Sequence, residues 1–114
     1  MNYIYMIKCK DLSIYTGVAK DLKKRLNVHH KKLKSAAKYT RTHDVNELCA
    51  LWTTNNRSNA QKLEYRIKKL KRDQKIRLIS DNSIFSDIFF DIDKEDFKRI
   101  ANDTLTEHKN CLRG

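Results

Sequence analysis

Two short apolar segments at the start of the chain constrain its fold more than any other part of the sequence. Residues 3–8 read Y-I-Y-M-I-K and residues 14–18 read I-Y-T-G-V, both rich in the β-branched and aromatic residues typical of strands. The polar residues 9–13 form a short connection between them, so the two segments predict an antiparallel hairpin. Apolar groups on both faces of the first segment predict a central strand. Gly17, inside the second segment, indicates a bend or a close approach to the backbone.

The rest of the first 80 residues predicts two helices and a third strand. Asp21 fits the N-cap of a helix with three leucines on one face, namely Leu22, Leu26 and Leu33. The pattern S-x-x-Q at residues 58–61 is typical of a capping box and predicts a second helix, whose apolar face holds Ala60, Leu63, Ile67 and Leu70. Residues 34–46 read as a basic loop, and residues 47–53 suit a strand. The predicted fold class is α/β, or α+β in stricter terms: a small three-stranded, mainly antiparallel sheet flanked by helices.

Beyond residue 80 the composition changes. Residues 1–80 carry 20 basic and 6 acidic side chains, whereas residues 81–114 carry 5 and 8. We therefore expect a basic domain over residues 1–80 and an acidic, partly apolar extension over residues 81–114. Asp93 fits the cap of a last helix with an apolar face formed by Phe97, Ile100, Ala101 and Leu105. These apolar groups must pack on the core, on a second copy or on a partner, which predicts a monomer or a weak homodimer formed through the extension.

The net charge of +11 is the strongest bulk property of the chain. A domain this basic attracts polyanions, and nucleic acid is the usual one, although charge does not distinguish DNA from RNA. No run approaches the ~18 apolar residues of a membrane span, and the N-terminus lacks a secretory signal. The three cysteines form no C-x-x-C pattern, which favours reduced thiols over a zinc site. We expect a cytoplasmic protein that does not bind membranes.

Five polar residues combine into a candidate site, although each also has an ordinary structural interpretation. Tyr5 and Tyr15 lie on neighbouring predicted strands, where tyrosine is common. The helix that follows brings Arg25 and His29 back toward the sheet, where a surface cation and a core histidine are the alternatives. Glu64 is the only acidic residue between residues 47 and 73, and it lies at the margin of the apolar face of its helix. A carboxylate there can pair with the lysine four residues later, or can hold Mg²⁺ together with phosphate oxygens and waters.

The order and spacing of these residues resemble those of the GIY-YIG nuclease superfamily. Members carry two tripeptides on the first two strands, then an arginine, then a glutamate, which in this chain are Tyr3-Ile4-Tyr5, Tyr15-Thr16-Gly17, Arg25 and Glu64. Small stand-alone bacterial members are the most similar, since they also resemble this chain in A-K-Y-T-R at residues 37–41, in His29 and in the segment L-E-Y-R-I-K-K-L. The resemblance covers roughly residues 3–80. The chain departs from it at Tyr3, which replaces a glycine, at Val18, where many relatives have a lysine, and in lacking a clear counterpart of a later asparagine near residues 74–82.

The resemblance implies a metal-dependent endonuclease that hydrolyses a phosphodiester of DNA, with branched or damaged DNA as candidate substrates. It implies that Glu64 holds Mg²⁺ or Mn²⁺. Tyr15 is then the expected general base for the attacking water, with His29 as the rival base. Arg25 would stabilise charge on the phosphoryl oxygens. Tyr5, together with His29, would orient the water or the phosphate.

Basic residues around these positions are expected to contact the phosphate backbone, which positions a substrate and carries little sequence information. The residues assigned to substrate contacts are Gly17, Lys20, Lys38, Tyr39, Arg41 and Lys68. Two alternatives stay open. One is a non-catalytic nucleic-acid-binding module that keeps the fold, and the other is a basic RNA- or ribosome-associated protein whose tyrosines only pack in the sheet. Convergence of the five candidate residues on one cleft is what the nuclease interpretation requires.

Overall fold

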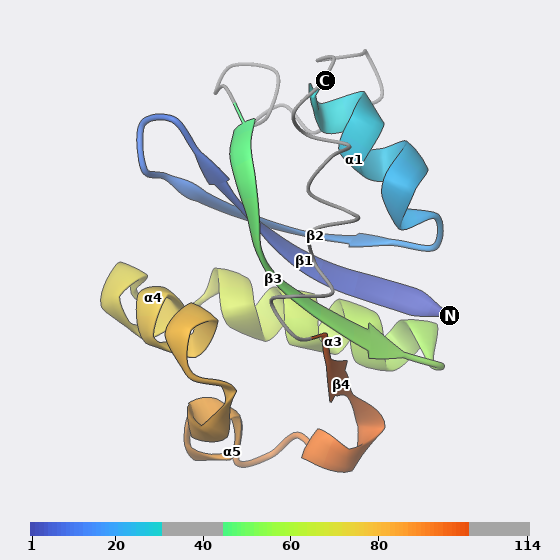
Figure 1. Cartoon of the computed structure of the whole chain (residues 1–114). Helices are drawn as coiled ribbons and strands as arrows, with labels where there is room; N and C mark the ends of the chain where they lie inside the picture. Colours follow the sequence, from blue (N-terminus) through green and yellow to red (C-terminus); the bar gives the residue numbers. More distant parts are fainter. Residues whose placement is uncertain (31–44, 101–114) are drawn as a thin grey trace.

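The computed structural model describes residues 1–30 and 45–100 of the 114-residue chain (Figure 1). Within these ranges the elements follow in the order β1 (Asn2–Cys9), β2 (Ile14–Ala19), α1 (Leu22–His30), β3 (Val45–Thr54), α3 (Arg57–Lys68), α4 (Arg72–Ser80), η1 (Asn82–Ile84), α5 (Phe85–Ile88), η2 (Lys94–Asp96) and β4 (Lys98–Arg99). The η elements are single turns of 3₁₀ helix.

The sheet is antiparallel throughout its described pairings, with the strand order β2-β1-β3-β4. The predicted hairpin and the central position of β1 are confirmed, and Tyr5 lies opposite Gly17 of β2 on one side and Leu51 of β3 on the other. The expected three-stranded sheet gains a fourth, two-residue strand, in which Arg99 lies opposite Trp52. The fold class is therefore α+β, as predicted.

Helices cover both faces of the sheet (Figure 1). Alternate residues of a strand point to opposite faces, so β1 contributes to two separate clusters. The cluster on the side of α3 contains Ile4, Met6, Ala50, Trp52, Ala60, Leu63, Ile67, Leu78, Phe85, Phe89 and Ile92. The cluster on the side of α1 contains Tyr5, Ile7, Cys9, Leu22, Leu26, Leu48 and Leu51. We call these the α3-face cluster and the α1-face cluster.

The N-cap of α1 is the residue expected from the sequence, whereas the N-cap of α3 is not. Asp21 caps α1, because its Oδ1 accepts a hydrogen bond from the Lys24 N–H at 3.1 Å. The capping box expected at residues 58–61 is wrong, since α3 already begins at Arg57. The N-cap is Asn56, an equally favourable cap that comes first in the chain and accepts a hydrogen bond from the Asn59 N–H at 3.0 Å.

The described part of the extension packs on the sheet's α3 side. Phe85 and Phe89 belong to the α3-face cluster, and the Asp91 carboxylate pairs with Arg66 of α3. The helix expected from Asp93 is wrong over residues 94–100, where Asp93 caps only the turn η2 and extended backbone follows at β4. Ala101 and Leu105, also expected on its apolar face, lie outside the described residues. A strand forms here instead of a helix because the edge of β3 offers backbone partners. The Ile100 N–H, for example, donates to the Leu51 carbonyl at 2.9 Å.

Candidate active site

Tyr5 lies at the centre of the candidate site. Its side chain is fully buried in the α1-face cluster and lies across Gly17 of the neighbouring strand. A Cβ atom at position 17 would come within 2.4 Å of the Tyr5 hydroxyl oxygen and 2.6 Å of its Cζ. The close approach expected at Gly17 therefore occurs, and the group that approaches its backbone is the ring of Tyr5. A side chain at position 17 would force that ring to move.

Tyr15 occupies the same face of the sheet, two residues before Gly17 on β2. Its ring centroid is 6.4 Å from that of Tyr5, and its Cε2 would lie 3.1 Å from a Cβ at position 17. Tyr15 is partly exposed, whereas Tyr5 is fully buried. The two tyrosines that the sequence singled out are thus neighbours with different access to solvent.

Arg25 connects α1 to the tyrosines. The cap at Asp21 fixes the first turn of α1, in which the Arg25 N–H donates to the Asp21 carbonyl at 3.1 Å. The Arg25 guanidinium donates a hydrogen bond to the Tyr5 hydroxyl. Burial, and next the neighbouring Tyr15, raise the pKa of Tyr5 well above its usual value, while the Arg25 hydrogen bond opposes that rise. Tyr5 is therefore a neutral phenol at physiological pH.

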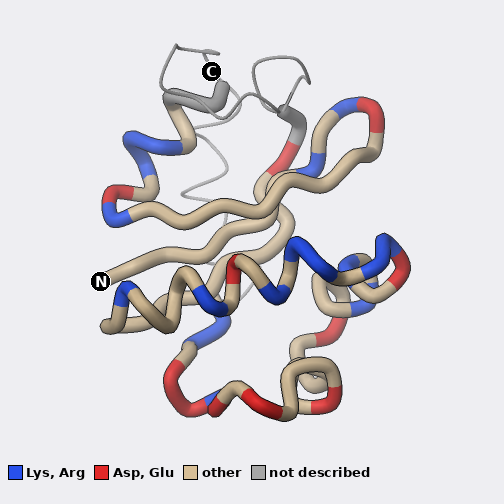
Figure 2. Tube along the Cα trace, turned by 180° about the vertical axis from the view of Figure 1, so that it is seen from behind, with Lys and Arg blue, Asp and Glu red and all other residues tan. Residues whose placement is uncertain are grey.

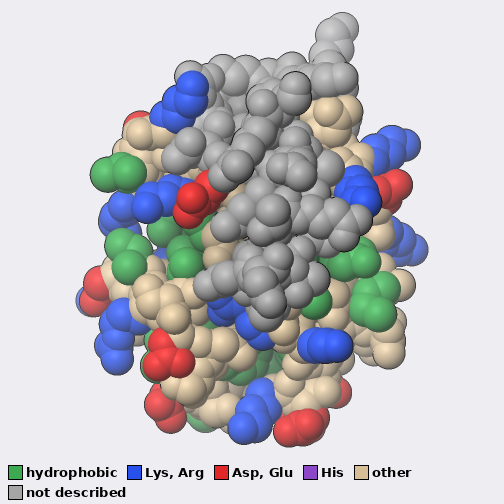
Figure 3. All heavy atoms as spheres, in the orientation of Figure 1, with side chains coloured by type: hydrophobic (Ala, Val, Ile, Leu, Met, Phe, Trp, Pro, Cys, Tyr) green, Lys and Arg blue, Asp and Glu red, His purple; other side chains and the backbone are tan. Residues whose placement is uncertain are grey.

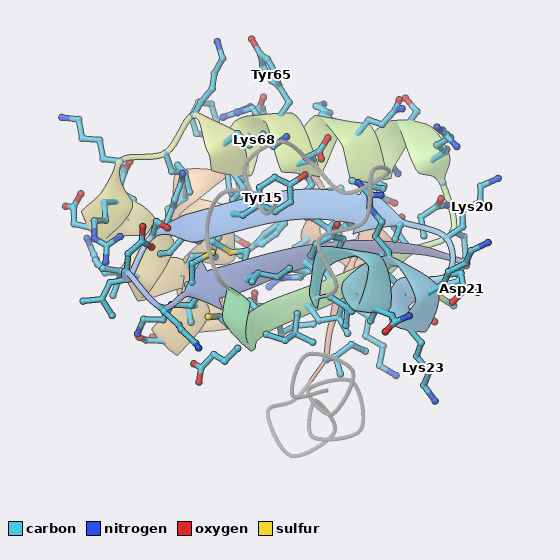
Figure 4. All side chains as sticks on the ribbon, turned by 90° about the horizontal axis from the view of Figure 1, so that it is seen from above. Tyr15, Lys20, Asp21, Lys23, Tyr65 and Lys68 are labelled. Carbon is cyan, nitrogen blue, oxygen red and sulfur yellow. The ribbon has the colours of Figure 1, made fainter. Side chains whose placement is uncertain are left out.

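Glu64 and Lys68 reach the same place from α3. The Lys68 Nζ lies 3.5 Å from a carboxylate oxygen of Glu64, so the pairing four residues apart, the structural alternative for Glu64, is present. The same Nζ lies 5.6 Å from the centroid of the Tyr15 ring, and Figure 4 shows the two side chains next to each other beside the edge strand β2. The Glu64 charge also acts on Tyr5, where it adds to the rise of the tyrosine's pKa. Glu64 is only partly exposed, as its place at the margin of the apolar face predicts.

Four of the five candidate residues are consequently brought together around β2: Tyr5, Tyr15, Arg25 and Glu64. The side chain of His29 lies outside the described residues, as do Lys38, Tyr39 and Arg41. Lys20 is exposed and follows the end of β2, at the opposite end of that strand from Tyr15 (Figure 4).

The contact between the Lys68 ammonium group and the Tyr15 ring was not expected from the sequence. The departure at Val18 is explained by packing, since Val18 lies against the α3-face cluster. A signal for Lys68 was nevertheless present: residues four apart lie on the same side of a helix, so Lys68 faces whatever Glu64 faces.

Asn82 lies within residues 74–82, where many relatives carry an asparagine. It accepts a hydrogen bond from the Trp52 indole at 2.9 Å and so belongs to the packing of the extension.

The donor set around Glu64 fits a magnesium-type ion held with the help of a substrate. Within residues 1–30 and 45–100 no three His, Cys, Asp or Glu side chains gather into a complete metal cage. Mg²⁺ is commonly bound through one or two carboxylates together with substrate phosphates and waters. The partly exposed Glu64 carboxylate is a group of this kind.

Basic side chains extend from the candidate site along α3 and α4. Residues 57–80 hold nine Lys or Arg against Glu64 and Asp73, and Figure 2 shows them along these two helices, with several acidic residues in the segment below. On the face drawn in Figure 3, by contrast, described basic side chains are scattered among acidic and apolar ones. Glu64 therefore lies among the basic side chains of α3. None of the helices that the structure describes is long and apolar enough to cross a membrane.

Comparison with known proteins identifies relatives of this chain. A family profile described as the GIY-YIG catalytic domain matches residues 1–77. A UPF0213 protein of Clostridium perfringens is 46% identical over 84 residues, which are 74% of this chain and 88% of that protein. A UPF0213 protein of Fusobacterium nucleatum is 39% identical over 98 residues, 86% of this chain and 96% of that protein. The solution NMR structure of the UPF0213 protein BH0048 from Bacillus halodurans is 37% identical, with 70% of this chain and 84% of that one covered and a TM-score of 0.45.

The profile spans well over half of the chain, and the two curated relatives are matched over most of their own short length. The names of these relatives state no activity, whereas the matched domain is that of a nuclease family. The chain therefore belongs to the GIY-YIG family, among its small stand-alone members that share the name UPF0213.

Proposed function

We propose that the protein is a metal-dependent endonuclease that hydrolyses a phosphodiester bond of DNA. One observation carries the proposal: Tyr5, Tyr15, Arg25 and Glu64 come from four elements and meet around β2. The buried Tyr5 hydroxyl contributes little to a core, because it needs a partner to offset its lost hydration, and the other three residues are partly exposed beside it. Their convergence beside a basic helix supports a site for a charged substrate.

Glu64 is the residue that would hold Mg²⁺ or Mn²⁺. Such an ion, when bound, polarises the scissile phosphate and stabilises the departing 3′ oxygen. The other residues can be assigned from their access to solvent and their charge. Arg25 is a fixed cation on the α1 side, suited to stabilising the phosphoryl oxygens.

The two tyrosines suit different parts of the reaction. Tyr15 is partly exposed and can meet a water at its Oη, so it is our choice of general base for the attacking water. Tyr5 is buried, and its raised pKa keeps its proton in place. In this assignment Tyr5 positions the Arg25 guanidinium through their hydrogen bond and does not act as a base.

Cleavage of defined DNA tests the proposal. Branched, flapped, nicked and plain duplex DNA would be incubated with Mg²⁺ or Mn²⁺ and with the wild type, Glu64→Gln and Tyr15→Phe. We expect the two variants to lose about 10²–10⁴-fold in rate, the usual contribution of such groups. Glu95→Gln and Tyr65→Phe, which alter an exposed carboxylate and an exposed tyrosine away from β2, are the matched controls and should cut like the wild type.

Equal cleavage by the wild type and Glu64→Gln would refute the assignment of the site. Salt-sensitive DNA binding without any metal-stimulated cleavage would favour the alternative, a binding module that keeps the fold without turnover. The panel of substrates also decides between branched, damaged and plain DNA, a choice that the fold does not make.

A further inference from the structure

Lys68 is the one cation of α3 that contacts both sides of the candidate site in the described structure. Its ammonium group lies 3.5 Å from the Glu64 carboxylate and 5.6 Å from the centroid of the Tyr15 ring. The side chain is about half exposed, so it can change partners without disturbing the core. Figure 4 shows that it reaches from α3 toward Tyr15 on β2.

The neighbouring Lys69 makes a similar contact with a tyrosine ring outside the candidate site. Its ammonium group lies 4.6 Å from the centroid of the Tyr65 ring, and Tyr65 is exposed on the outer side of the same helix. Both lysines therefore lie over a tyrosine ring and carry the same charge on adjacent residues. Only Lys68 is also paired with the carboxylate of the candidate site.

An ammonium ion and a divalent metal ion compete for one carboxylate. The contact between Glu64 and Lys68 is an exposed pair four residues apart, a type that is weak and easily exchanged. A divalent ion carries twice the charge and gains further ligands from substrate phosphates. Once displaced from Glu64, the ammonium group still has a favourable position over the Tyr15 ring, since a cation over an aromatic face is attracted by the ring.

We infer that Lys68 is a positioning residue of this site: it holds the Glu64 carboxylate in the metal-free protein, gives way to a divalent cation there, and then stays over the ring of Tyr15. The inference rests on the proposed function, because it takes Glu64 as the metal ligand. It adds a coupling between metal binding and the placement of a cation beside Tyr15. Lys68 thus has a role beyond the contact with substrate phosphates expected from the sequence.

Mn²⁺ binding measures this competition without any cleavage. Free Mn²⁺ would be followed by electron paramagnetic resonance during titration of the wild type, Lys68→Gln, Lys69→Gln and Glu64→Gln. Each titration would contain a short DNA with non-hydrolysable phosphate linkages, because the site is expected to use substrate phosphates, and a titration of that DNA alone would be subtracted. We expect Lys68→Gln to bind Mn²⁺ about three- to tenfold more tightly, because a competing cation next to Glu64 is gone. Lys69→Gln removes the same charge one residue away and should stay close to the wild type, and Glu64→Gln should lose the site.

Cleavage supplies a second measurement that loss of structure would not mimic. In Lys68→Gln the Mn²⁺ concentration for half-maximal cleavage should fall, while the maximal rate should fall as well, since Tyr15 has lost its neighbouring cation. A disordered site would instead need more metal. Lys68→Arg, which keeps the charge, should restore much of the maximal rate.

The possible failures are distinguishable. Mn²⁺ binding that depends on Glu64 but is unchanged or weaker in Lys68→Gln overturns the role of Lys68 and leaves the proposed function standing. Binding that ignores Glu64→Gln, or no binding by either the wild type or Lys68→Gln, overturns the metal site and this inference together.

Discussion

Alternate residues of β1 point to opposite faces of the sheet, and the two faces are filled in different ways. Toward α3 the strand presents Ile4 and Met6, which pack with Trp52 and with the aromatic residues of the extension. Toward α1 it presents Tyr5, whose hydroxyl lies over Gly17 and accepts a hydrogen bond from Arg25. Toward α3 lies the larger apolar cluster, which the extension completes, whereas toward α1 a tyrosine hydroxyl is held among apolar side chains beside Gly17 and Arg25.

The difference indicates a division of labour within one small sheet. The α3-face cluster stabilises the fold, and the described part of the extension completes it with Phe85, Phe89 and Ile92. The α1-face cluster surrounds Tyr5, and under the proposed function it holds the two tyrosines in place for the reaction. Helix α3 serves both, since Leu63 and Ile67 enter the core while Glu64 and Lys68 reach the site from its margin.

The largest effect on stability is expected from a cavity in the α3-face cluster. Phe89 is fully buried, with its ring centroid 5.0 Å from that of Phe85. Phe89→Ala should lower the free energy of unfolding by about 3–5 kcal/mol, the usual cost of removing a buried aromatic side chain. Urea unfolding measures the loss, and cleavage per folded molecule should match the wild type because the cavity lies on the other face.

Phe89→Leu serves as the milder variant if the alanine variant does not fold. If either variant lost cleavage while remaining folded, the two faces would be coupled and the division of labour would be wrong.

A smaller effect on stability, with a large effect on activity, is expected at Gly17. In Gly17→Ala the new methyl group would force the Tyr5 hydroxyl and the Tyr15 ring to move, because it would lie 2.4 Å and 3.1 Å from their nearest atoms. Such overpacking costs about 1–3 kcal/mol of stability. Cleavage should fall at least about 100-fold, since displaced groups lose their alignment with a substrate.

Val18→Ala is the matched control for Gly17→Ala, because Val18 belongs to the same strand but packs on the α3-face cluster. It should lower stability by a similar amount, about 1 kcal/mol or somewhat more, and leave cleavage per folded molecule unchanged. Loss of cleavage in both variants would show that the strand as a whole, and not the contact with Tyr5, is what the site needs.

Local patterns in the sequence predicted much of this arrangement. Strand alternation placed β1 at the centre, Asp21 fixed the start of α1, and helical periodicity put Glu64 at the margin of α3. These features depend on neighbours within a few residues, which a sequence displays directly. The resemblance to a nuclease family then singled out Tyr5 and Tyr15 as candidate site residues.

Features that depend on distant parts of the chain were not predictable in the same way. Residues 98–99 form a strand because the edge of β3 is available, although the local pattern favours a helix. Arg99 shows the same dependence: it donates to the Leu78 and Ile79 carbonyls at the end of α4 and lies over the Trp52 ring. The contact of Lys68 with Tyr15 joins α3 to β2, and only the folded structure brings those elements together.

The smallest effect expected concerns the hydroxyl of Tyr5. Tyr5→Phe removes one hydrogen bond to Arg25 and should cost about 1 kcal/mol near neutral pH. Its effect on pH dependence is more specific. Burial raises the pKa of Tyr5 in the folded protein, so above about pH 10 the unfolded chain releases this proton while the folded chain keeps it.

The folded state then binds more protons than the unfolded state, and stability must fall as pH rises. The wild type should therefore lose stability more steeply above pH 10 than Tyr5→Phe, and the gap between the two should narrow as pH increases. Urea unfolding at several pH values between 8 and about 11 measures this, with Tyr65→Phe on the exposed side of α3 as the matched control. Equal slopes for the wild type and Tyr5→Phe would mean that Tyr5 ionises as easily when folded as when unfolded, and that the α1 face does not hold it as a neutral, positioned group.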